Sequence, residues 1–459
     1  MPIFNSTPDE VCQRFKAGKV SVAVFGLGRI GLPTALSFAD TGALVYGVDV
    51  QESLIELIKN RNVYLDEPGI PELLARVLDK KRFIATSNYQ EAMKHAEVCI
   101  ICVPTPITNG KYPDYSSIIQ VCNTSLRFLK LQDLVIIEST ISPGTIENLI
   151  IPLIAKNTGL QAGIEFGIAC CPERADPGTV LANIQQIPRV VGGYTMKSTK
   201  LVAALYRCVT SAKIFEVRNA RTASAVKLTE NIFRDVNIAL MNELAILYEK
   251  LGIDIVEIIK AASTKYNFQP HYPGAGVGGP CLPANPYYLI QEGIQVGFVP
   301  LLIRMAREIN DRMPQHIIDL TLQALNRAGK SAKNAKIVIL GITYKPGVHD
   351  FQLSPAIPVI QRLAELDATL IIYDPLLQPN DISQLPFLLG LKTVKNLDEI
   401  PIQIDCFILV TAHPEFKQID FLKLKSLSSK PLIIVDGRNL FNSNELPKDS
   451  IYIGVGRGY

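Results

Sequence analysis

A cysteine at the end of a glycine-rich loop is the first candidate for chemistry in this chain. Residues 273–281 read PGAGVGGPC, so four glycines within six positions precede Cys281. Glycine adopts backbone angles that other residues avoid, and it lets main-chain N–H groups approach a ligand closely. A thiol presented from such a loop can attack a carbonyl carbon and hold it covalently. The alternative is a glycine-rich turn beside a buried structural cysteine.

A second signal lies near the N-terminus, where residues 26–31 read GLGRIG between an apolar run and a helical pattern. This is the context of a dinucleotide-binding fingerprint, whose glycines make the turn, admit the pyrophosphate and allow close packing. Asp49 ends the next apolar run, where a carboxylate binds the ribose 2′-OH. A 2′-phosphate would meet like charge there, so the sequence predicts NAD rather than NADP. A redox cofactor together with a nucleophilic thiol suggests oxidation through a thioester.

Three further polar residues are candidates for the same chemistry. Lys227 and Asn231 are four residues apart in a helical pattern and therefore share one face. An ammonium and an amide side by side can stabilise a developing oxyanion, although such a pair is also typical of a solvated helix face. Glu173 follows a predicted strand at the end where α/β sheets bind ligands. It is predicted either to activate a water molecule or to cap the following turn.

Composition narrows the class of protein. At 459 residues the chain is long enough for two or three domains. The 46 basic and 43 acidic residues nearly balance, which argues against a nucleic-acid surface. Nine scattered cysteines suit a reducing compartment, and five histidines without a cysteine cluster argue against a metal site. No apolar stretch is long enough for a membrane span, and the polar N-terminus does not read as a secretory signal. We therefore expect a cytoplasmic protein.

Alternating strand and helix patterns must position these residues. β-branched runs predict buried strands at residues 20–25, 44–49, 98–103, 134–139 and 166–170, and helices at 51–59 and 71–78. The C-terminal part repeats this alternation, with strands predicted at residues 336–341, 369–374, 406–410 and 432–436. Such alternation is typical of parallel α/β sheets.

Helical patterns without strands separate the two α/β parts. They cover residues 222–251, 253–263 and 299–328, and Pro314 is expected to kink or divide the last of them. The predicted fold is therefore α/β, with two Rossmann-like parallel-sheet domains joined by a helical middle domain. The expected boundaries are residues 1–205, 206–315 and 316–459. Apolar residues in 222–251 exceed one core-facing stripe and predict a homodimer, the alternative being burial between the two α/β domains of one chain; they include Ala225, Leu228, Ile232, Ile238, Leu240 and Leu244.

Taken in order, the motifs resemble those of the UDP-glucose/GDP-mannose dehydrogenase family over nearly the whole chain. The matching segments are residues 26–31, 102–106, 138–145, 171–174, 273–281, 341–350 and 436–439, with the Lys227/Asn231 helix. The resemblance implies an NAD-binding domain, a helical dimerising middle, and a C-terminal domain that holds the nucleotide of a UDP-sugar. It implies no metal.

The resemblance also implies roles for individual residues. Cys281 is the nucleophile, Lys227 and Asn231 stabilise the oxyanion, and Glu173 with Thr140 handles water. The implied cofactor contacts are Gly26, Leu27, Gly28, Arg29, Ile30, Gly31, Asp49, Val103, Pro104, Thr105 and Thr140. The implied substrate contacts are Glu173, Arg174, Lys227, Asn231, Gly274, Gly276, Gly278, Lys345 and Arg438.

Three positions and one segment depart from the family pattern. Asn285 stands where the family usually has an aspartate, which bears on how Lys227 is oriented and where the first alcohol proton goes. Pro280 replaces a histidine common in hexosamine enzymes, and Gln352 replaces a cofactor-binding arginine. Residues 264–272 contain no arginine, whereas many relatives reach a substrate across the dimer from this segment.

The resemblance thus implies NAD-dependent, four-electron oxidation of C6 of a UDP-N-acetylhexosamine to the uronate, using two NAD molecules and water. Residues 171–174 and 273–279 resemble UDP-N-acetylmannosamine and UDP-N-acetylglucosamine dehydrogenases more than UDP-glucose enzymes, whose corresponding segments carry phenylalanines. UDP-glucose remains an alternative substrate. A two-electron β-hydroxyacid dehydrogenase and a non-catalytic nucleotide-sugar-binding protein are the competing interpretations of the chain. Polysaccharide or glycan precursor synthesis is the pathway that the resemblance implies.

Overall fold

The computed structural model describes residues 2–65 and 67–458. The chain forms two compact units. The N-terminal unit contains Met1–Glu230 and Tyr287–Phe298, and the C-terminal unit contains Asn231–Pro286 and Val299–Tyr459. Each unit has its own sheet and its own hydrophobic core.

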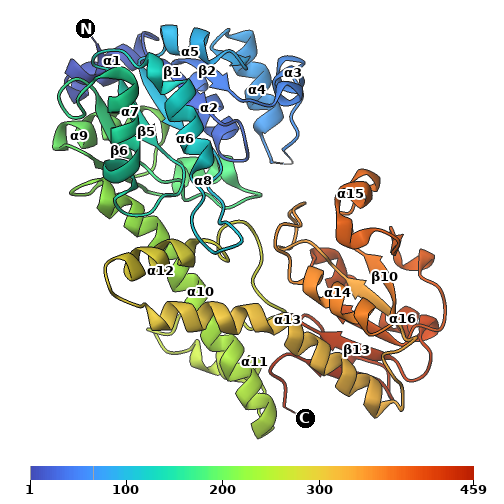
Figure 1. Ribbon diagram of the computed structural model, residues 1–459. Helices are drawn as coiled ribbons and strands as arrows, with labels where there is room; N and C mark the ends of the chain where they lie inside the picture. The colour runs from blue at the N-terminus through green and yellow to red at the C-terminus, as the bar shows by residue number, and fades with distance from the viewer. Residues whose placement is uncertain (1, 66, 459) are drawn as a thin grey trace. The chain divides into compact units, whose positions relative to one another are not determined.

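An eight-stranded sheet forms the centre of the N-terminal unit, in the order β3-β2-β1-β4-β5-β6-β7-β8 (Figure 1). Its strands are β1 (Ser21–Phe25), β2 (Leu44–Val48), β3 (Phe83–Thr86), β4 (Val98–Ile101), β5 (Leu134–Ile137), β6 (Gly167–Cys170), β7 (Arg189–Gly193) and β8 (Ile214–Glu216). All neighbouring pairs are parallel except β6 and β7. The strand order reverses between β1 and β4, which is where parallel α/β sheets bind ligands.

Helices cover both faces of this sheet. They are α1 (Pro8–Lys16), α2 (Gly31–Asp40), α3 (Glu52–Lys59), α4 (Ile70–Asp79), α5 (Tyr89–His95), α6 (Ser116–Thr124), α7 (Ile151–Thr158), α8 (Val180–Gln186) and α9 (Met196–Val209). A π-helical turn at Ile146–Ile150 precedes α7, and 3₁₀ turns occur at Ile3–Asn5 and Leu126–Phe128. The apolar side chains of α2 are almost all buried, so the helix that follows the glycine fingerprint is held firmly.

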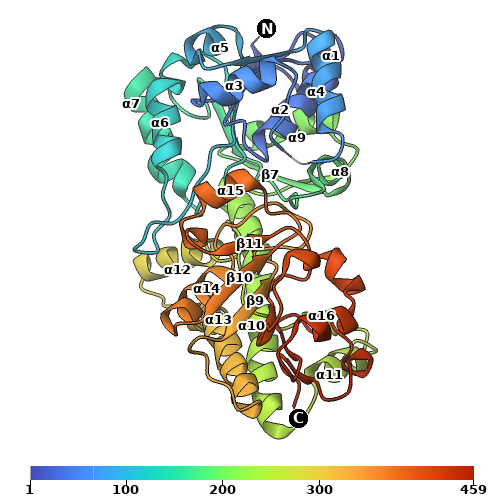
Figure 2. The same ribbon diagram turned by 90° about the vertical axis from the view of Figure 1, so that its right-hand side faces the viewer.

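The C-terminal unit repeats this architecture with six parallel strands in the order β11-β10-β9-β12-β13-β14. The strands are β9 (Lys336–Leu340), β10 (Thr369–Tyr373), β11 (Lys392–Val394), β12 (Cys406–Leu409), β13 (Ile433–Asp436) and β14 (Ile451–Gly454). Figure 2 shows β9, β10 and β11 side by side. The order reverses again, between β9 and β12.

The helices of the second half include two long ones, α10 (Ala220–Leu251) and α13 (Leu301–Arg327). The shorter helices are α11 (Ile255–Ala262), α12 (Asn285–Gln295), α14 (Ala356–Glu365), α15 (Pro379–Gln384) and α16 (Phe421–Leu427). Short 3₁₀ turns lie at Pro386–Leu388, Leu397–Glu399, Pro414–Gln418 and Ser443–Glu445. Pro314 stands inside α13, which continues through it as one helix, so the proline does not divide the element.

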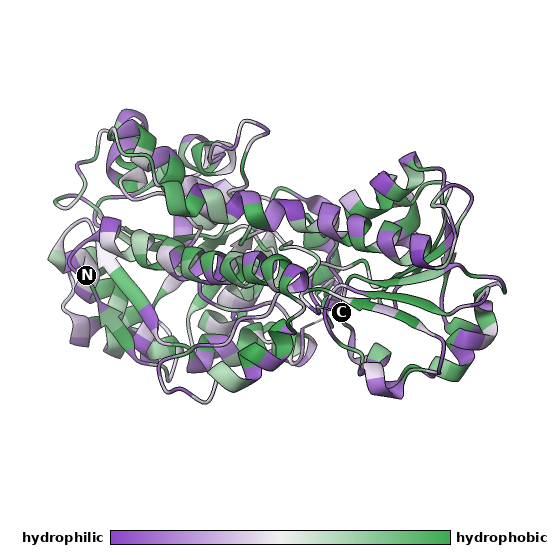
Figure 3. Ribbon diagram, turned by 90° about the horizontal axis from the view of Figure 1, so that it is seen from below, coloured by the Kyte–Doolittle hydropathy of each residue, from purple (hydrophilic) through white to green (hydrophobic). Residues whose placement is uncertain are grey.

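Hydropathy follows this layering. In Figure 3 the strands are mostly green, whereas most helices carry both colours, as expected for elements with one buried face. None of the helices in the described ranges is long and apolar enough to cross a membrane.

The predicted fold class is confirmed, and every strand predicted from the sequence is present. The sequence analysis missed β3, β7, β8, β11 and β14, most of which lie toward the edges of the sheets. The expected domain boundaries remain predictions.

Candidate active site

The glycine fingerprint forms a tight turn between β1 and α2. Gly26 has a φ of 88°, and its N–H donates to the carbonyl of Val48 at 2.8 Å. A Cβ on Gly31 would lie only 1.8 Å from the carbonyl oxygen of Gly26, so this position requires glycine. A Cβ on Gly28 would meet no described atom within 4 Å, so the backbone here faces open space. This cradle fits a dinucleotide pyrophosphate at the start of α2.

Asp49 is fixed beside this turn, where the sequence predicted a ribose contact. Its Oδ2 accepts the N–H of Leu27 at 2.8 Å, and its Oδ1 accepts the N–H of Gln51 at 3.0 Å. The Tyr64 hydroxyl donates to the carbonyl of Leu27 at 3.2 Å, and burial raises the pKa of Tyr64 to about 12. The arrangement presents a carboxylate to a ribose hydroxyl and opposes a 2′-phosphate.

The segments that follow β4 and β5 are joined to each other. The Ser139 hydroxyl donates to the carbonyl of Val103 at 2.7 Å, and the Thr105 hydroxyl donates to the carbonyl of Thr140 at 2.8 Å. The Tyr288 hydroxyl donates to the carbonyl of Thr105. The structure thus brings the predicted residues 103–105 together with Thr140, one strand from the fingerprint turn after β1.

Glu173 accepts hydrogen bonds on both carboxylate oxygens. Oε1 accepts the N–H groups of Arg174 at 2.6 Å and Ala175 at 2.8 Å, as expected if Glu173 caps the turn. Oε2 accepts Nη2 of Arg189 at 2.6 Å. Burial opposes ionisation, but the charge of Arg189, the two N–H groups and Lys227 outweigh it and hold the pKa of Glu173 below its ordinary value. Glu173 is therefore an oriented carboxylate.

The side chain of Arg174 is directed to other protein groups. Its Nε donates to Glu230 Oε2 at 3.0 Å, and its Nη1 donates to the carbonyl of Pro188. These contacts connect the segment after β6 to helix α10. Arg174 therefore holds the segment after β6 to helix α10. The predicted substrate contact of Arg174 stays a prediction.

Lys227 and Asn231 both lie on α10, as predicted. The side-chain N–H of Asn231 donates to Asn285 Oδ1 at 2.5 Å, and the backbone N–H of Asn285 donates to the carbonyl of Cys281 at 2.8 Å. Asn285 therefore links the predicted oxyanion stabiliser to the turn that carries the thiol. An amide needs one N–H for Asn285 and keeps the second available for a substrate oxygen.

Cys281 is exposed, which contradicts the interpretation of a buried structural cysteine. Its loop is anchored at both ends. The N–H of Gly274 donates to Asn242 Oδ1 at 2.9 Å, and the N–H of Gly279 donates to the carbonyl of Gln352 at 2.9 Å. A Cβ on Gly278 would lie 2.6 Å from the carbonyl oxygen of Leu353, so close backbone approach requires glycine there.

Arg438 contacts the same loop from the end of β13. Its Nη2 donates to the carbonyl of Gly276 at 3.3 Å, and its Nε donates to the carbonyl of Val410 at 2.8 Å. Desolvation lowers the pKa of this half-buried arginine to about 10. Lys345 lies in the segment after β9, where its carbonyl accepts the hydroxyl of Thr343 at 3.1 Å. The structure brings Arg438, Gly274 and Gly276 together.

Sequence reasoning missed the partners that fix Glu173. Arg189 begins β7 with its side chain almost fully buried, and Glu138 follows β5 with no exposed side-chain surface. Glu138 lies at the end of the strand predicted at residues 134–139, where no role was predicted for it, and Arg189 lies in a segment for which no strand was predicted. A basic residue inside the apolar run 187–191 was the signal that could have found Arg189.

Comparison with known proteins gives the same picture along the whole chain. Models of the UDP-glucose/GDP-mannose dehydrogenase family match residues 20–210 (NAD binding domain), 221–312 (central domain) and 338–443 (UDP binding domain). The UDP-N-acetyl-D-mannosamine dehydrogenase of Pyrococcus horikoshii is 38% identical over 439 residues, covering 95% of this chain and 99% of the relative. The chain belongs to the UDP-glucose/GDP-mannose dehydrogenase family.

A further relative and a solved structure support the assignment. The UDP-N-acetyl-D-glucosamine 6-dehydrogenase of Salmonella typhi is 30% identical over 423 residues, covering 92% of this chain and 96% of the relative. The solved structure of a UDP-D-ManNAc dehydrogenase from Pyrococcus horikoshii superposes with a TM-score of 0.88 at 36% identity, covering 96% of this chain and all of that one. The predicted family, its NAD cofactor and its oxidoreductase class are confirmed.

Proposed function

We propose that this dehydrogenase oxidises C6 of a UDP-N-acetylhexosamine to the carboxylate, with Cys281 as the covalent nucleophile. The observation that carries the proposal is the exposed thiol on a glycine loop whose backbone is anchored by Asn242 and Arg438. A positioned thiol has no purpose in a two-electron alcohol oxidation, whereas oxidation of an aldehyde to an acid requires an acyl intermediate.

NAD, when bound in the fingerprint cradle, supplies the hydride acceptor. The sugar carbon loses two hydrides in all, and each of two NAD molecules accepts one of them. The first loss of hydride and hydroxyl proton gives an aldehyde. The Cys281 sulfur bonds to the aldehyde carbon, and its proton is transferred to give the neutral thiohemiacetal hydroxyl. Loss of the second hydride and of that hydroxyl proton gives a thioester. Water then attacks the thioester carbon, the C–S bond breaks, and the acid and the thiol are released.

The balance for one turnover is one alcohol, two NAD⁺ and one water converted to one carboxylate, two NADH and three protons. Lys227 and the second N–H of Asn231 stabilise the oxygen that carries negative charge when sulfur or water adds. Glu173, with Thr140, holds the water for the last step. Asn285 cannot act as a base at neutral pH, so its part is to orient Asn231 and the Cys281 turn.

The remaining contacts divide between cofactor and substrate. The fingerprint residues 26–31, Asp49 and residues 103–105 hold NAD, while Lys345, Arg438 and the glycines of the 273–281 loop hold the UDP-sugar. We also propose the division into a cofactor domain (1–205), a helical middle (206–315) and a UDP-binding domain (316–459). A cytoplasmic location follows from the scattered cysteines.

The acetamido sugars are proposed because the relatives at 30% identity and above named here are UDP-N-acetyl-D-mannosamine and UDP-N-acetyl-D-glucosamine dehydrogenases. UDP-glucose is the alternative substrate. Relative kcat/KM values for the three UDP-sugars decide between them, and a clear preference for UDP-glucose would overturn the assignment.

Stoichiometry tests the reaction class. Purified enzyme should form two NADH for each UDP-sugar consumed, with the uronate as product. One NADH for each sugar indicates a two-electron dehydrogenase, and none indicates a binding protein. Either result contradicts the proposed function.

A further inference from the structure

In the N-terminal unit, the buried Arg189 lies between the buried Glu138 and the partly buried Glu173. Arg189 Nη2 is 2.6 Å from Glu173 Oε2, and Arg189 Nη1 is 3.0 Å from Glu138 Oε1. The exposed side-chain fractions are 5% for Arg189, 0% for Glu138 and 10% for Glu173. Glu173 is therefore the only member of this triad with appreciable exposed surface, so a reacting water would meet it first.

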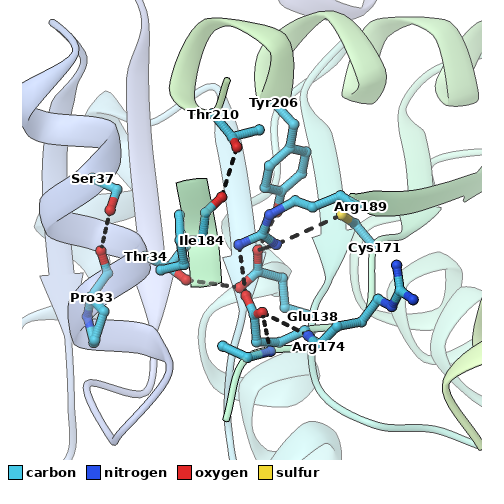
Figure 4. A network of polar contacts seen from close by, with 12 residues as sticks. Pro33, Thr34, Ser37, Glu138, Cys171, Arg174, Ile184, Arg189, Tyr206 and Thr210 are labelled. Atoms are coloured by element: carbon cyan, nitrogen blue, oxygen red, sulfur yellow. Dashed lines mark hydrogen bonds and ion pairs between the residues drawn. The ribbon is translucent and has the colours of Figure 1, made fainter. Parts of the chain in front are cut away.

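Glu138 is enclosed by donors from three other elements. The Thr34 hydroxyl on α2 lies 3.1 Å from its Oε2, and the Cys102 thiol after β4 lies 3.2 Å from the same oxygen. The Tyr206 hydroxyl on α9 donates to Oε1 (Figure 4). The guanidinium carbon of Arg189 lies 4.7 Å from the centre of the Tyr206 ring. Glu138 thus has a full set of donors and no path to substrate.

This geometry is costly unless it has a use. Two buried carboxylates share one guanidinium, and removing charges from water costs several kcal/mol for each ion. Well-packed apolar residues would stabilise the fold at least as well. The arrangement differs from a stabilising ion pair in one respect. One carboxylate, Glu138, is fully buried, whereas the other, Glu173, reaches the surface.

We propose that Arg189 and Glu138 are positioning residues for Glu173, with Arg189 keeping the Glu173 carboxylate ionised and aimed, and Glu138 fixing Arg189 and moderating its charge. The proposal rests on the proposed role of Glu173 in hydrolysis of the Cys281 thioester. The hydrogen bond from Thr34 also connects Glu138 to α2, the helix that follows the glycine fingerprint.

The charged groups around Glu173 agree with this role. Burial raises the pKa of Glu138, whereas Arg189 and Lys227 contribute to a pKa of Glu173 below its ordinary value. Burial, aided by Glu138, raises the pKa values of Tyr206 and Cys102. These two side chains therefore stay neutral donors.

The pKa of Cys171 behaves in the same way, since burial raises it to about 12. Arg174, next in the chain to Glu173, is occupied by its ion pair with Glu230. Arg189 and Lys227 are thus the cations that act on the Glu173 carboxylate from β7 and α10.

Two substitutions should displace the acid limb of thioester hydrolysis in opposite directions. Arg189→Gln removes the positive charge, so the pKa of Glu173 rises and its active carboxylate form is lost at a higher pH than in the parent. Glu138→Gln removes the competing negative charge, so Arg189 acts on Glu173 alone, the pKa of Glu173 falls, and the limb moves to a lower pH than in the parent. The double variant should lie between the single variants. A structural role would lower activity without this order.

Hydrolysis is isolated by mixing enzyme, NAD and UDP-sugar, quenching at intervals, and measuring acylated Cys281 by mass spectrometry across pH. Near neutral pH we expect Arg189→Gln to accumulate the acyl-enzyme, with hydrolysis slowed roughly tenfold or more. Arg189→Lys should recover part of the rate, because lysine keeps the charge but lacks the fork that bridges two carboxylates. Arg207→Gln, which breaks an exposed pair with Glu216, is the control and should behave as the parent.

A second measurement does not require turnover. Infrared titration of ¹³C-labelled carboxylates, compared with a Glu173→Gln sample to assign the band, should show the same order of protonation among the variants. NAD binding and thermal unfolding of each variant establish that it is folded, and in the double variant Glu138 is not left as a buried charge without its cation. An unchanged acid limb and unchanged Glu173 band in folded variants overturn the positioning role. A parent enzyme that never acylates Cys281 overturns the proposed function instead, while the infrared order still tests the positioning.

Discussion

Cys281 differs from the other cysteines of the described chain in its exposure. Cys99, Cys122, Cys170, Cys171 and Cys406 are buried, and burial raises the pKa of each thiol. Thiols with raised pKa values are poor nucleophiles near neutral pH, because the thiolate is the reactive form. The exposed thiol of Cys281 does not carry the desolvation that raises the pKa values of the buried thiols. The difference in exposure supports the proposal that Cys281 is the nucleophile.

Cys281→Ala should abolish NADH formation from the synthetic C6 aldehyde, by roughly a thousandfold or more, while NAD binding and unfolding temperature are retained. Cys281→Ser should be nearly as damaging, or should trap a slowly hydrolysed ester, since a hydroxyl is a much weaker nucleophile. The measurement is NADH absorbance with NAD and the aldehyde. Near-normal turnover in either variant would make Cys281 structural and remove the thioester from the mechanism.

Asn285 links Asn231 to the turn that carries Cys281. Its Oδ1 accepts from Asn231, and the residue is buried. Asn285→Ala should lower kcat roughly tenfold or more, because the Asn231 amide loses the acceptor that orients it. Asn285→Asp keeps an acceptor and adds a base, so its kcat should equal or exceed that of the parent. Steady-state kinetics at saturating NAD provide the comparison; equal damage by both variants would refute an orienting role.

Helices α10 and α13 hold the thiol loop through a buried polar network. Asn242 on α10 accepts from Gly274 at 2.9 Å and donates to Asn310 Oδ1 on α13 at 2.8 Å. Asn310 Nδ2 donates to Asp235 Oδ1 at 2.9 Å, and Arg307 Nη1 lies 2.5 Å from the same oxygen. These contacts form a continuous network from the Asp235–Arg307 ion pair to Gly274, the first glycine of the loop.

Asn242→Ala removes both hydrogen bonds and leaves a buried N–H and a buried carbonyl oxygen unsatisfied. We expect a loss of about 2–4 kcal/mol in the free energy of unfolding. We also expect kcat to fall by a larger factor than the factor by which KM for the UDP-sugar changes. Asn237→Ala is the matched control on the same helix, because Asn237 bonds only locally to the carbonyl of Phe233. Denaturant unfolding and steady-state kinetics give the two readouts. Equal kcat values for the two variants would separate the network from the loop.

The elements of this fold could be predicted where hydrophobic period and turn chemistry agree. The strand, glycine turn and acid around Gly26 and Asp49 are local in sequence, and each occupies its predicted place. Edge strands such as β8 and β11 are only three residues long and carry little periodic signal. The Glu138–Arg189 contact joins residues far apart in the chain, and no local pattern encodes such a pairing.

Asp374 occupies the position in the second sheet that Asp49 occupies in the first, but in different surroundings. Gly341 and Asp374 repeat the arrangement of Gly26 and Asp49, since the N–H of Ile342 donates to Asp374 Oδ2 at 2.6 Å. Asp374, however, is buried against His413 at 3.1 Å, so it is closed to a ribose hydroxyl. The second sheet therefore keeps the turn without the dinucleotide contact, a difference that depends on burial and is invisible in the strand pattern.

Asp374 should contribute a stability that depends on pH. Burial opposes its ionisation, but hydrogen bonds from His413 and from the N–H groups of Ile342 and Leu376 outweigh burial and lower its pKa. A lowered folded-state pKa stabilises the fold above the unfolded value of about 3.9 and loses that contribution as the pH falls through the folded value. The parent should thus lose more stability on acidification than Asp374→Asn. Unfolding temperatures measured from pH 7 down to about pH 2, through the window below the unfolded value, test this, and parallel curves would contradict it.

At the scale of the whole molecule, helix α10 leaves a stripe of large apolar side chains uncovered. Phe233, Leu240, Leu247 and Leu251 are 47–59% exposed. Their spacing of seven, seven and four residues places them on one side of the helix. The sequence had predicted a different set: Leu228 and Ile232 are buried, and only Leu240 of the six residues predicted is exposed.

A second copy of the chain is the occupant that we propose for this stripe. The start of α13, in the same unit, carries further exposed apolar residues, namely Leu301, Leu302 and Met305. The nearly balanced charge of the chain offers no repulsion between copies. Exposed apolar surface of this kind is typical of an interface.

Leu240→Glu should therefore convert a dimer to a monomer in sedimentation at micromolar concentration, since a carboxylate would be desolvated in the apolar contact. Leu422→Glu is the matched control, because Leu422 is 71% exposed on α16, away from the stripe. If dimerisation supports α10, the Leu240→Glu variant should also lose NADH production, because Lys227 and Asn231 lie on the same helix. A parent that sediments as a fully active monomer would contradict the interface. A Leu240→Glu variant that stays dimeric would instead place the contact on another surface.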